Sequence, residues 1–161
     1  MDSPLAVFIN GPPCSGKSTL IRKVASSYCA SVYPVDSYRR DHGVKAWSVL
    51  SRELYEDISA SVIVESSGLS TRLPGLKRAL HKRGRRVESI YITADSEKLK
   101  SRILQSRPRR DKEELLALVD ACESRVPADA MGTIDTTHGR ERRSVKELLR
   151  LLDALMLGSL D

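Results

Sequence analysis

Close to its N-terminus the chain carries an apolar run that leads directly into a glycine-bounded loop. Residues 5–9 (LAVFI) are continuously apolar, which is typical of a strand buried on both faces of a sheet. Residues 11–18 (GPPCSGKS) follow, and a helix is predicted from Thr19 to about Ala30. This order of strand, loop and helix is the first unit of an alternation that continues along the chain.

Strands and helices are predicted to alternate through the remaining sequence. Further strands are expected at residues 31–36, 62–64, 87–93 and 132–136. Helices are expected at residues 44–58 and 73–84, from a cap at Asp95 or Ser96 to a point before Pro108, from Asp111 onward, and after a capping box formed by Ser144 and Glu147. Five strands in this alternation predict an α/β domain with a parallel sheet and helices on both faces.

Length and composition limit the class of protein. The 161 residues suit one domain spanning residues 1–161, and 40% hydrophobic with 30% charged residues is a globular balance. No apolar run approaches the ~18 residues of a membrane span, and the first residues lack the basic flank of a secretory signal. Three cysteines without a Cys-x-x-Cys pair argue against a disulfide framework or a zinc site. We therefore expect a cytoplasmic protein.

The basic excess lies in one part of the chain. The net charge is +6, yet residues 72–110 alone hold thirteen basic and three acidic side chains. One interpretation is a solvated helix face with its loop. The other is a surface that meets the phosphates of a nucleotide or of nucleic acid. The charge count does not decide between them.

The loop at residues 11–18 matches the Walker A pattern, Gly-x-x-x-x-Gly-Lys-Ser, at every fixed position. Its glycines permit a tight turn, its backbone N–H groups can surround phosphate, and the following helix presents its positive end. Lys17 is expected to neutralise the β- and γ-phosphates of ATP, and Ser18 to bind Mg²⁺. The residues predicted to contact the nucleotide are Gly11, Pro12, Pro13, Cys14, Ser15, Gly16, Lys17, Ser18 and Thr19.

Two further strand ends carry candidate catalytic residues. The second predicted strand ends at Asp36, three residues before Arg39. Because parallel strands gather their carboxyl ends at one edge of a sheet, Asp36 is expected to face the γ-phosphate and accept a proton from a hydroxyl. Arg39 could neutralise the phosphate or the acceptor, unless this segment is only a surface turn. Glu65 ends the third strand, where it could hold Mg²⁺ through water, contact the acceptor, or be an ordinary strand-end acid.

The pattern of the loop and of residues 35–39 (VDSYR) resembles the polynucleotide 5′-hydroxyl kinase-like clade of P-loop kinases, which is related to zeta toxins and small-molecule P-loop kinases. The resemblance implies an adenylate-kinase-like core with sheet order 2-3-1-4-5 and a mobile lid. It also implies that Asp36 is the general base and that Arg39 contacts the acceptor or a phosphate. GTPase motifs (Asp-x-x-Gly after the third strand, Asn-Lys-x-Asp) are absent from the sequence.

In such enzymes the lid follows the fourth strand, which here corresponds to about residues 102–112. Its arginines would stabilise the transferring phosphoryl group. Of the four candidates we expect Arg102 and Arg107 to be catalytic, with Arg109 and Arg110 as the alternatives. Tyr38 is the candidate for stacking on an acceptor base, which completes an acceptor site of Asp36, Tyr38, Arg39 and Glu65.

The sequence thus predicts an ATP- and Mg²⁺-dependent kinase that acts on a hydroxyl group. A nucleic-acid acceptor, either a 5′-hydroxyl end or a hydroxymethylated base, is favoured by six basic residues outside the lid: Lys77, Arg78, Lys82, Arg83, Arg85 and Arg86. A small-molecule alcohol (a nucleoside, nucleotide, sugar or antibiotic) is the alternative. An ATP-binding switch module with little turnover is a third, although such a module needs neither Asp36 nor lid arginines.

Overall fold

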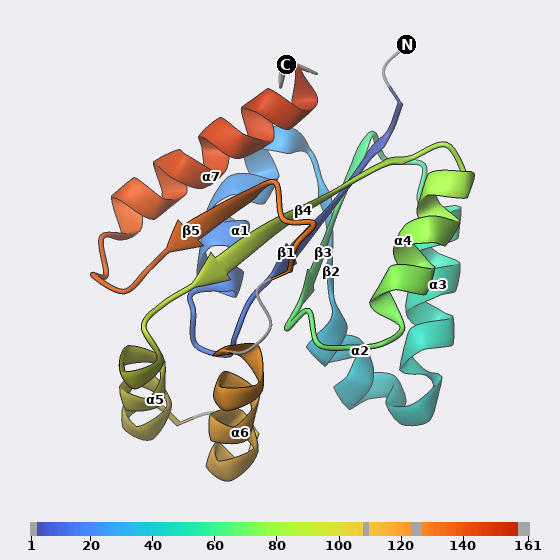
Figure 1. Cartoon of the computed structure of the whole chain (residues 1–161). Helices are drawn as coiled ribbons and strands as arrows, with labels where there is room; N and C mark the ends of the chain where they lie inside the picture. The colour runs from blue at the N-terminus through green and yellow to red at the C-terminus, as the bar shows by residue number, and fades with distance from the viewer. Residues whose placement is uncertain (1–2, 108–109, 124–126, 158–161) are drawn as a thin grey trace.

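Five parallel strands form one sheet in the order β2-β3-β1-β4-β5 (Figure 1). The computed structural model describes residues 3–107, 110–123 and 127–157. The strands are β1 (Leu5–Asn10), β2 (Ser31–Pro34), β3 (Ser61–Ser66), β4 (Arg86–Thr93) and β5 (Gly132–Asp135). The α/β class and the sheet order 2-3-1-4-5 are therefore confirmed.

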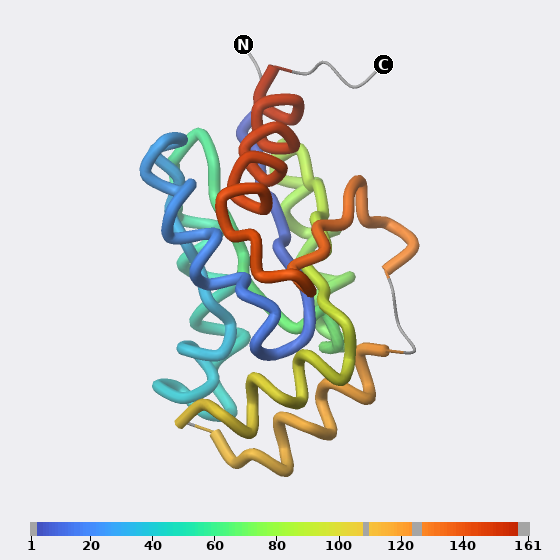
Figure 2. Tube along the Cα trace, turned by 90° about the vertical axis from the view of Figure 1, so that its left-hand side faces the viewer, coloured from blue at the N-terminus to red at the C-terminus, as the bar shows by residue number. Residues whose placement is uncertain are grey.

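Helices cover both faces of the sheet. On one face lie α1 (Lys17–Ala25), which runs into the 3₁₀ turn η1 (Ser26–Tyr28), and α7 (Glu141–Met156). The opposite face is covered by α2 (Val35–His42), the 3₁₀ turn η2 (Gly43–Lys45), α3 (Ala46–Glu56) and α4 (Leu73–Lys82). A separate pair, α5 (Ser96–Gln105) and α6 (Lys112–Glu123), lies side by side below the sheet in both views (Figures 1 and 2).

The apolar core consists of two layers, one on each face of the sheet, and β1 contributes to both. All six residues of β1 are buried, as its continuous apolar run predicts. Because successive strand residues point to opposite faces, Val7 and Ile9 pack with α1 and α7, whereas Ala6 and Phe8 pack with α3 and α4. A smaller cluster joins α5 to α6.

Strand register decides which loops meet. Ile9 is paired with Glu65, and Glu65 is paired with Pro34, so β1, β2 and β3 end at nearly the same level. The segments that follow these three strands therefore lie along one edge of the sheet. Leu5, at the start of β1, is paired with Arg86, so β4 begins at the opposite end of the strands from the loop.

The segment after β2 departs from the prediction. The strand ends at Pro34, and residues 35–42 form α2, with Asp36 in its first turn. Only Val35 of this helix is buried. A helix with one buried apolar residue has no apolar periodicity to detect, so it was missed from the sequence.

Two predicted helix limits were also wrong. The capping box at Ser144 does not form, because α7 begins at Glu141 and Ser144 lies buried one turn inside it. The charged residues before Ser144 continue the same helix on its solvent side. The helix expected over residues 44–58 is instead η2 followed by α3, and Ile58 is almost fully exposed beyond its end.

Other helix starts agree with the sequence. The Asp95 carboxylate accepts hydrogen bonds from the N–H groups of Glu97 and Lys98, which caps α5. Asp111 caps α6 in the same way through Glu113 and Glu114. These two caps fix the first residues of α5 and α6.

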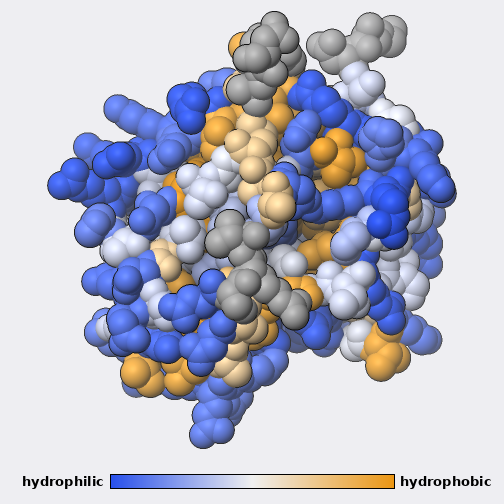
Figure 3. Space-filling model, in the orientation of Figure 1, coloured by the Kyte–Doolittle hydropathy of each residue, from blue (hydrophilic) through white to orange (hydrophobic). Residues whose placement is uncertain are grey.

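The surface is largely hydrophilic on the face shown in Figure 3, where apolar residues form separate groups between polar ones. Within the ranges that the structure describes, no helix is both long and apolar enough to span a bilayer.

The layer between the sheet and α7 is expected to carry much of the stability. Leu148 is 0% exposed, so Leu148→Ala should lower the free energy of unfolding by about 2–5 kcal/mol, because it leaves a cavity. Leu104→Ala is the matched control, since Leu104 is 59% exposed on α5 and should change stability by less than about 0.5 kcal/mol. Urea denaturation measures both, and equal effects would contradict the assignment of the core.

Candidate active site

The loop that follows β1 passes very close to β4. A Cβ atom on Gly11 would lie 1.9 Å from the carbonyl oxygen of Ile92, so only glycine permits this approach. Further along, Cys14 (φ 59°) and Gly16 (φ 91°) have left-handed backbone conformations, and α1 begins directly after Gly16. Alternation between left- and right-handed residues turns successive N–H groups toward a common centre, which is the geometry of an anion-binding nest.

Lys17 reaches back over this loop. Its Nζ donates hydrogen bonds of 2.8 Å to the carbonyl oxygens of both Gly11 and Pro12. Burial lowers the pKa of the ammonium from its usual value, while the neighbouring carboxylates of Glu65 and Asp36 oppose that shift. An anion bound in the loop would compensate the positive charge of the half-buried Lys17.

The loop also fits a phosphate and a metal ion chemically. The Ser15 hydroxyl is buried without a hydrogen-bond partner in the described part of the chain. Ser18 Oγ donates to Glu65 Oε1 at 2.5 Å, so two oxygen ligands lie together beside the loop. No group of three His, Cys, Asp or Glu residues able to hold a metal occurs among the residues described. A Mg²⁺ ion here would take its other ligands from phosphate and water, which is how Mg²⁺ usually binds.

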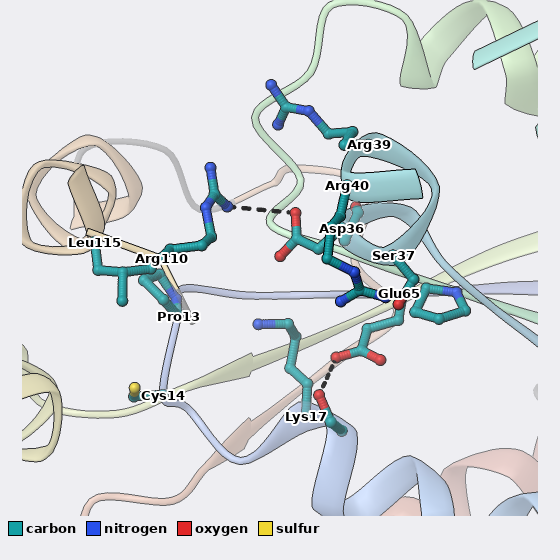
Figure 4. A pocket seen from close by; sticks show the side chains of 13 residues that line it. Pro13, Cys14, Lys17, Asp36, Ser37, Arg39, Arg40, Glu65, Arg110 and Leu115 are labelled. Carbon is teal, nitrogen blue, oxygen red and sulfur yellow. Dashed lines mark hydrogen bonds and ion pairs between the residues drawn. The ribbon is translucent and has the colours of Figure 1, made fainter. Parts of the chain in front are cut away.

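A cavity of about 550 Å³ opens beside Lys17 (Figure 4). It is bordered by the loop, by α2, by the end of β3 and by the segment where α6 begins. Asp36 projects into it from α2, and Arg110 Nη1 lies 3.4 Å from Asp36 Oδ1. Arg110 also pairs with Glu114. The charged residues around the cavity are Lys17, Asp36, Arg39, Arg40, Glu65 and Arg110.

A second cavity, of about 270 Å³, lies at the start of α1. It is lined by Cys14, Ser15, Gly16 and Thr19 on one side and by Arg102, Thr136 and Gly139 on the other. Cys14 borders both cavities, so residues of the loop separate them. The pKa of the Cys14 thiol is raised by burial, in spite of the nearby cations Lys17 and Arg102. The thiol therefore stays protonated at neutral pH.

The candidate lid arginines occupy different places. Arg102 fastens the loop, because its guanidinium donates to the carbonyl oxygens of Cys14 (3.1 Å) and Thr136 (2.7 Å). Arg107 is exposed and borders neither cavity, and Arg109 lies outside the described residues. Arg110, rather than the favoured pair of Arg102 and Arg107, reaches the cavity beside Lys17.

Tyr38 does not reach the cavity that it was expected to border. Its ring packs on Tyr33 at a centroid distance of 6.3 Å, and its hydroxyl donates to Glu53. Arg40 lines the cavity instead and was missed. In a helix the fourth residue after Asp36 shares its face, so recognition of α2 would have identified Arg40.

Half of the basic cluster at residues 77–86 is engaged in contacts within the protein, whereas Arg78 and Lys82 are exposed. Arg85 is 7% exposed and donates to the carbonyl oxygens of Asp57 and Ser59. Lys77 pairs with Asp129 at 2.6 Å, and Arg83 lies over the ring of Tyr55. Since β4 begins at the sheet edge opposite the loop, the residues just before it do not border the cavities. The geometry thus lends no support to a nucleic-acid acceptor.

Comparison with solved structures identifies the fold class. The chain superposes on shikimate kinase from Acinetobacter baumannii with a TM-score of 0.65 and 21% identity, covering 98% of this chain and 96% of that one. A sugar kinase from Janibacter superposes with a TM-score of 0.66 and 19% identity, covering 92% of this chain and 94% of that one. A gluconokinase from Sinorhizobium meliloti superposes with a TM-score of 0.62 and 14% identity, covering 99% of this chain and 100% of that one.

No protein-family model matches the sequence, and neither does any curated protein. The structural likeness, at these identities, shows the fold alone, which this chain shares with these kinases and which here contains the Walker A pattern at residues 11–18.

A substitution of Arg102 tests whether this residue stabilises the fold, as its hydrogen bonds to the loop indicate, rather than acting only in catalysis. We expect Arg102→Met to lower the free energy of unfolding by about 1–3 kcal/mol, because two partly buried carbonyl groups lose a charged donor. Arg107→Met, on an exposed side chain, should leave stability unchanged. Thermal and urea unfolding measure both variants. If Arg102→Met is as stable as the wild type, the bracing role is wrong.

Proposed function

We propose that the protein is an ATP-dependent phosphotransferase that transfers the γ-phosphoryl group of ATP to the hydroxyl of a small-molecule alcohol. The observation that supports this most strongly is the pair of cavities on either side of the Walker A loop, one of which contains a carboxylate facing Lys17. One cavity suits the nucleoside and the other the acceptor, with the phosphates passing along the loop between them.

The nucleotide is assigned to the smaller cavity. Gly16 and Thr19 line this cavity at the N-terminus of α1, where the helix dipole and free N–H groups favour phosphate. The Arg102 guanidinium borders the same cavity and offers a flat cationic surface for a base. In this arrangement the γ-phosphate extends past Cys14 toward Lys17.

Asp36 is the residue proposed to act on the acceptor. Its carboxylate would take the proton from the acceptor hydroxyl as the oxygen bonds to the γ-phosphorus, while the bond to the β-phosphate oxygen breaks and ADP leaves. Lys17 would neutralise the phosphate oxygens throughout. Ser18 and, through water, Glu65 would hold Mg²⁺, which supplies charge stabilisation to the phosphates when bound.

A small acceptor is preferred over nucleic acid for two reasons. The basic cluster that favoured nucleic acid does not border the cavity and half of it is engaged within the protein, and the Tyr38 hydroxyl donates to Glu53 rather than lining the cavity. In addition, the named structural neighbours include kinases of shikimate, gluconate and a sugar. A cavity of about 550 Å³ is of the size that accommodates a small molecule.

Asp36→Asn tests the proposed chemistry. Loss of a general base should lower kcat by about 10²–10⁴-fold while the affinity for ATP is retained. Glu56→Gln is the control, because Glu56 is exposed at the end of α3 and does not line the cavity. Transfer is measured with γ-labelled ATP on sugars, hydroxy acids, nucleosides, nucleotides and antibiotics, with 5′-hydroxyl RNA and DNA and hydroxymethyl-base DNA alongside.

Label on a small alcohol, lost in Asp36→Asn and kept in Glu56→Gln, supports the proposal. Label on an oligonucleotide alone would contradict the small acceptor. Binding of ATP without transfer to any acceptor would contradict the kinase assignment and indicate a switch module.

A further inference from the structure

Cationic side chains outnumber carboxylates around the acceptor cavity. Four cations border it against only two carboxylates, Asp36 and Glu65. Glu65 already accepts a hydrogen bond from Ser18, and Asp36 is paired with Arg110. Two of the cations also pair with carboxylates outside the lining, Arg40 with Asp41 and Arg110 with Glu114. Among the described residues, Arg39 has no such ion pair.

The charged side chains around the cavity lie on two sides of the Asp36 carboxylate. Figure 4 shows Lys17 and Glu65 on one side of the Asp36 carboxylate, with Arg40 reaching toward Glu65. Arg39 and Arg110 lie on the other side. Arg39 stands three residues after Asp36 on α2, so the two side chains leave the same helix one turn apart. The phosphates of ATP, bound at the loop and Lys17, would lie on the near side of Asp36.

The two far-side arginines are only partly neutralised. Arg39 is exposed and has no carboxylate within 4.0 Å in the part of the chain that the structure describes. Arg110 shares its charge between Asp36 and Glu114, and the 3.4 Å contact to Asp36 is a long one. Two guanidinium groups beside a cavity can bind a carboxylate or a phosphate through charge-assisted hydrogen bonds.

We propose that the acceptor is an anionic alcohol whose carboxylate or phosphate-ester group is bound by Arg39 and Arg110 while its hydroxyl lies at Asp36. This inference rests on the proposed function, because it takes the cavity as the acceptor site. An anionic acceptor approaching ATP is repelled by the phosphates, and cations on its far side offset that repulsion. A neutral alcohol would leave Arg39 without any partner.

Binding without turnover tests this directly. Calorimetry in the presence of Mg²⁺ and a non-hydrolysable ATP analogue would compare matched pairs that differ in charge. Carboxylates are represented by gluconate against glucose and by shikimate against its methyl ester. Phosphate esters are represented by glycerol 3-phosphate against glycerol and by nucleoside monophosphates against nucleosides. The two sets distinguish the two sources of negative charge.

At least one anionic member is expected to bind more tightly than its neutral counterpart. Arg39→Gln and Arg110→Gln should each weaken that binding by about 10- to 100-fold, the worth of one hydrogen bond to a charged group. The affinity for the ATP analogue should be unchanged. Arg39→Lys, which keeps the charge but loses the planar fork, should fall between wild type and Arg39→Gln. Arg78→Gln, an exposed arginine on α4, is the control.

The inference is overturned if neutral members bind as tightly as anionic ones, if the two Gln variants keep the preference for the anion, or if no member binds. It is also overturned if the variants weaken the ATP analogue equally, because the arginines would then serve the nucleotide. Anion binding that depends on Arg39 and Arg110, without phosphate transfer to the bound alcohol, would leave this inference standing and contradict the proposed function.

Discussion

The close approach of the phosphate loop to β4 is the constraint on which the site depends. The backbone of Gly11 lies against the carbonyl of Ile92 with no room for a side chain. This contact lets the chain leave the central strand at once and turn into α1. Arg102 then joins the loop to the segment after β5, through Cys14 and Thr136. Three elements distant in sequence are thereby held around one anion-binding nest.

The parallel sheet supplies the second requirement, which is the alignment of strand ends. Because β1, β2 and β3 end at the same level, the loop, the start of α2 and Glu65 are neighbours without any long connection. Asp36 owes its position to this register and to the helix that begins right after Pro34. The first turn of α2 presents the carboxylate to the cavity, and the second turn presents arginines. One short helix thus carries both the proposed base and part of the proposed acceptor site.

Much of this architecture was predictable from local sequence patterns. The buried run of β1, the glycine loop and the caps at Asp95 and Asp111 are short-range signals, and each led to the element observed. The helix α2 was not predictable in the same way, because only one of its residues is buried. The roles of the arginines depend on long-range packing. Sequence alone could assign Arg102 and Arg110 to a predicted lid, but not show that one donates to the loop while the other borders the cavity.

The basic cluster before β4 illustrates the same limit. A run of cations predicts a phosphate-binding surface when only charge is counted. The fold instead uses Arg85 to satisfy backbone carbonyls and Lys77 to pair with Asp129, both remote in sequence.

A crystal structure with Mg²⁺ and a non-hydrolysable ATP analogue tests the account most directly. We predict the base beside Arg102, the phosphates along the loop, and the γ-phosphate between Lys17 and Asp36. A nucleotide whose base occupies the Asp36 cavity, or whose phosphates lie away from the loop, would contradict it.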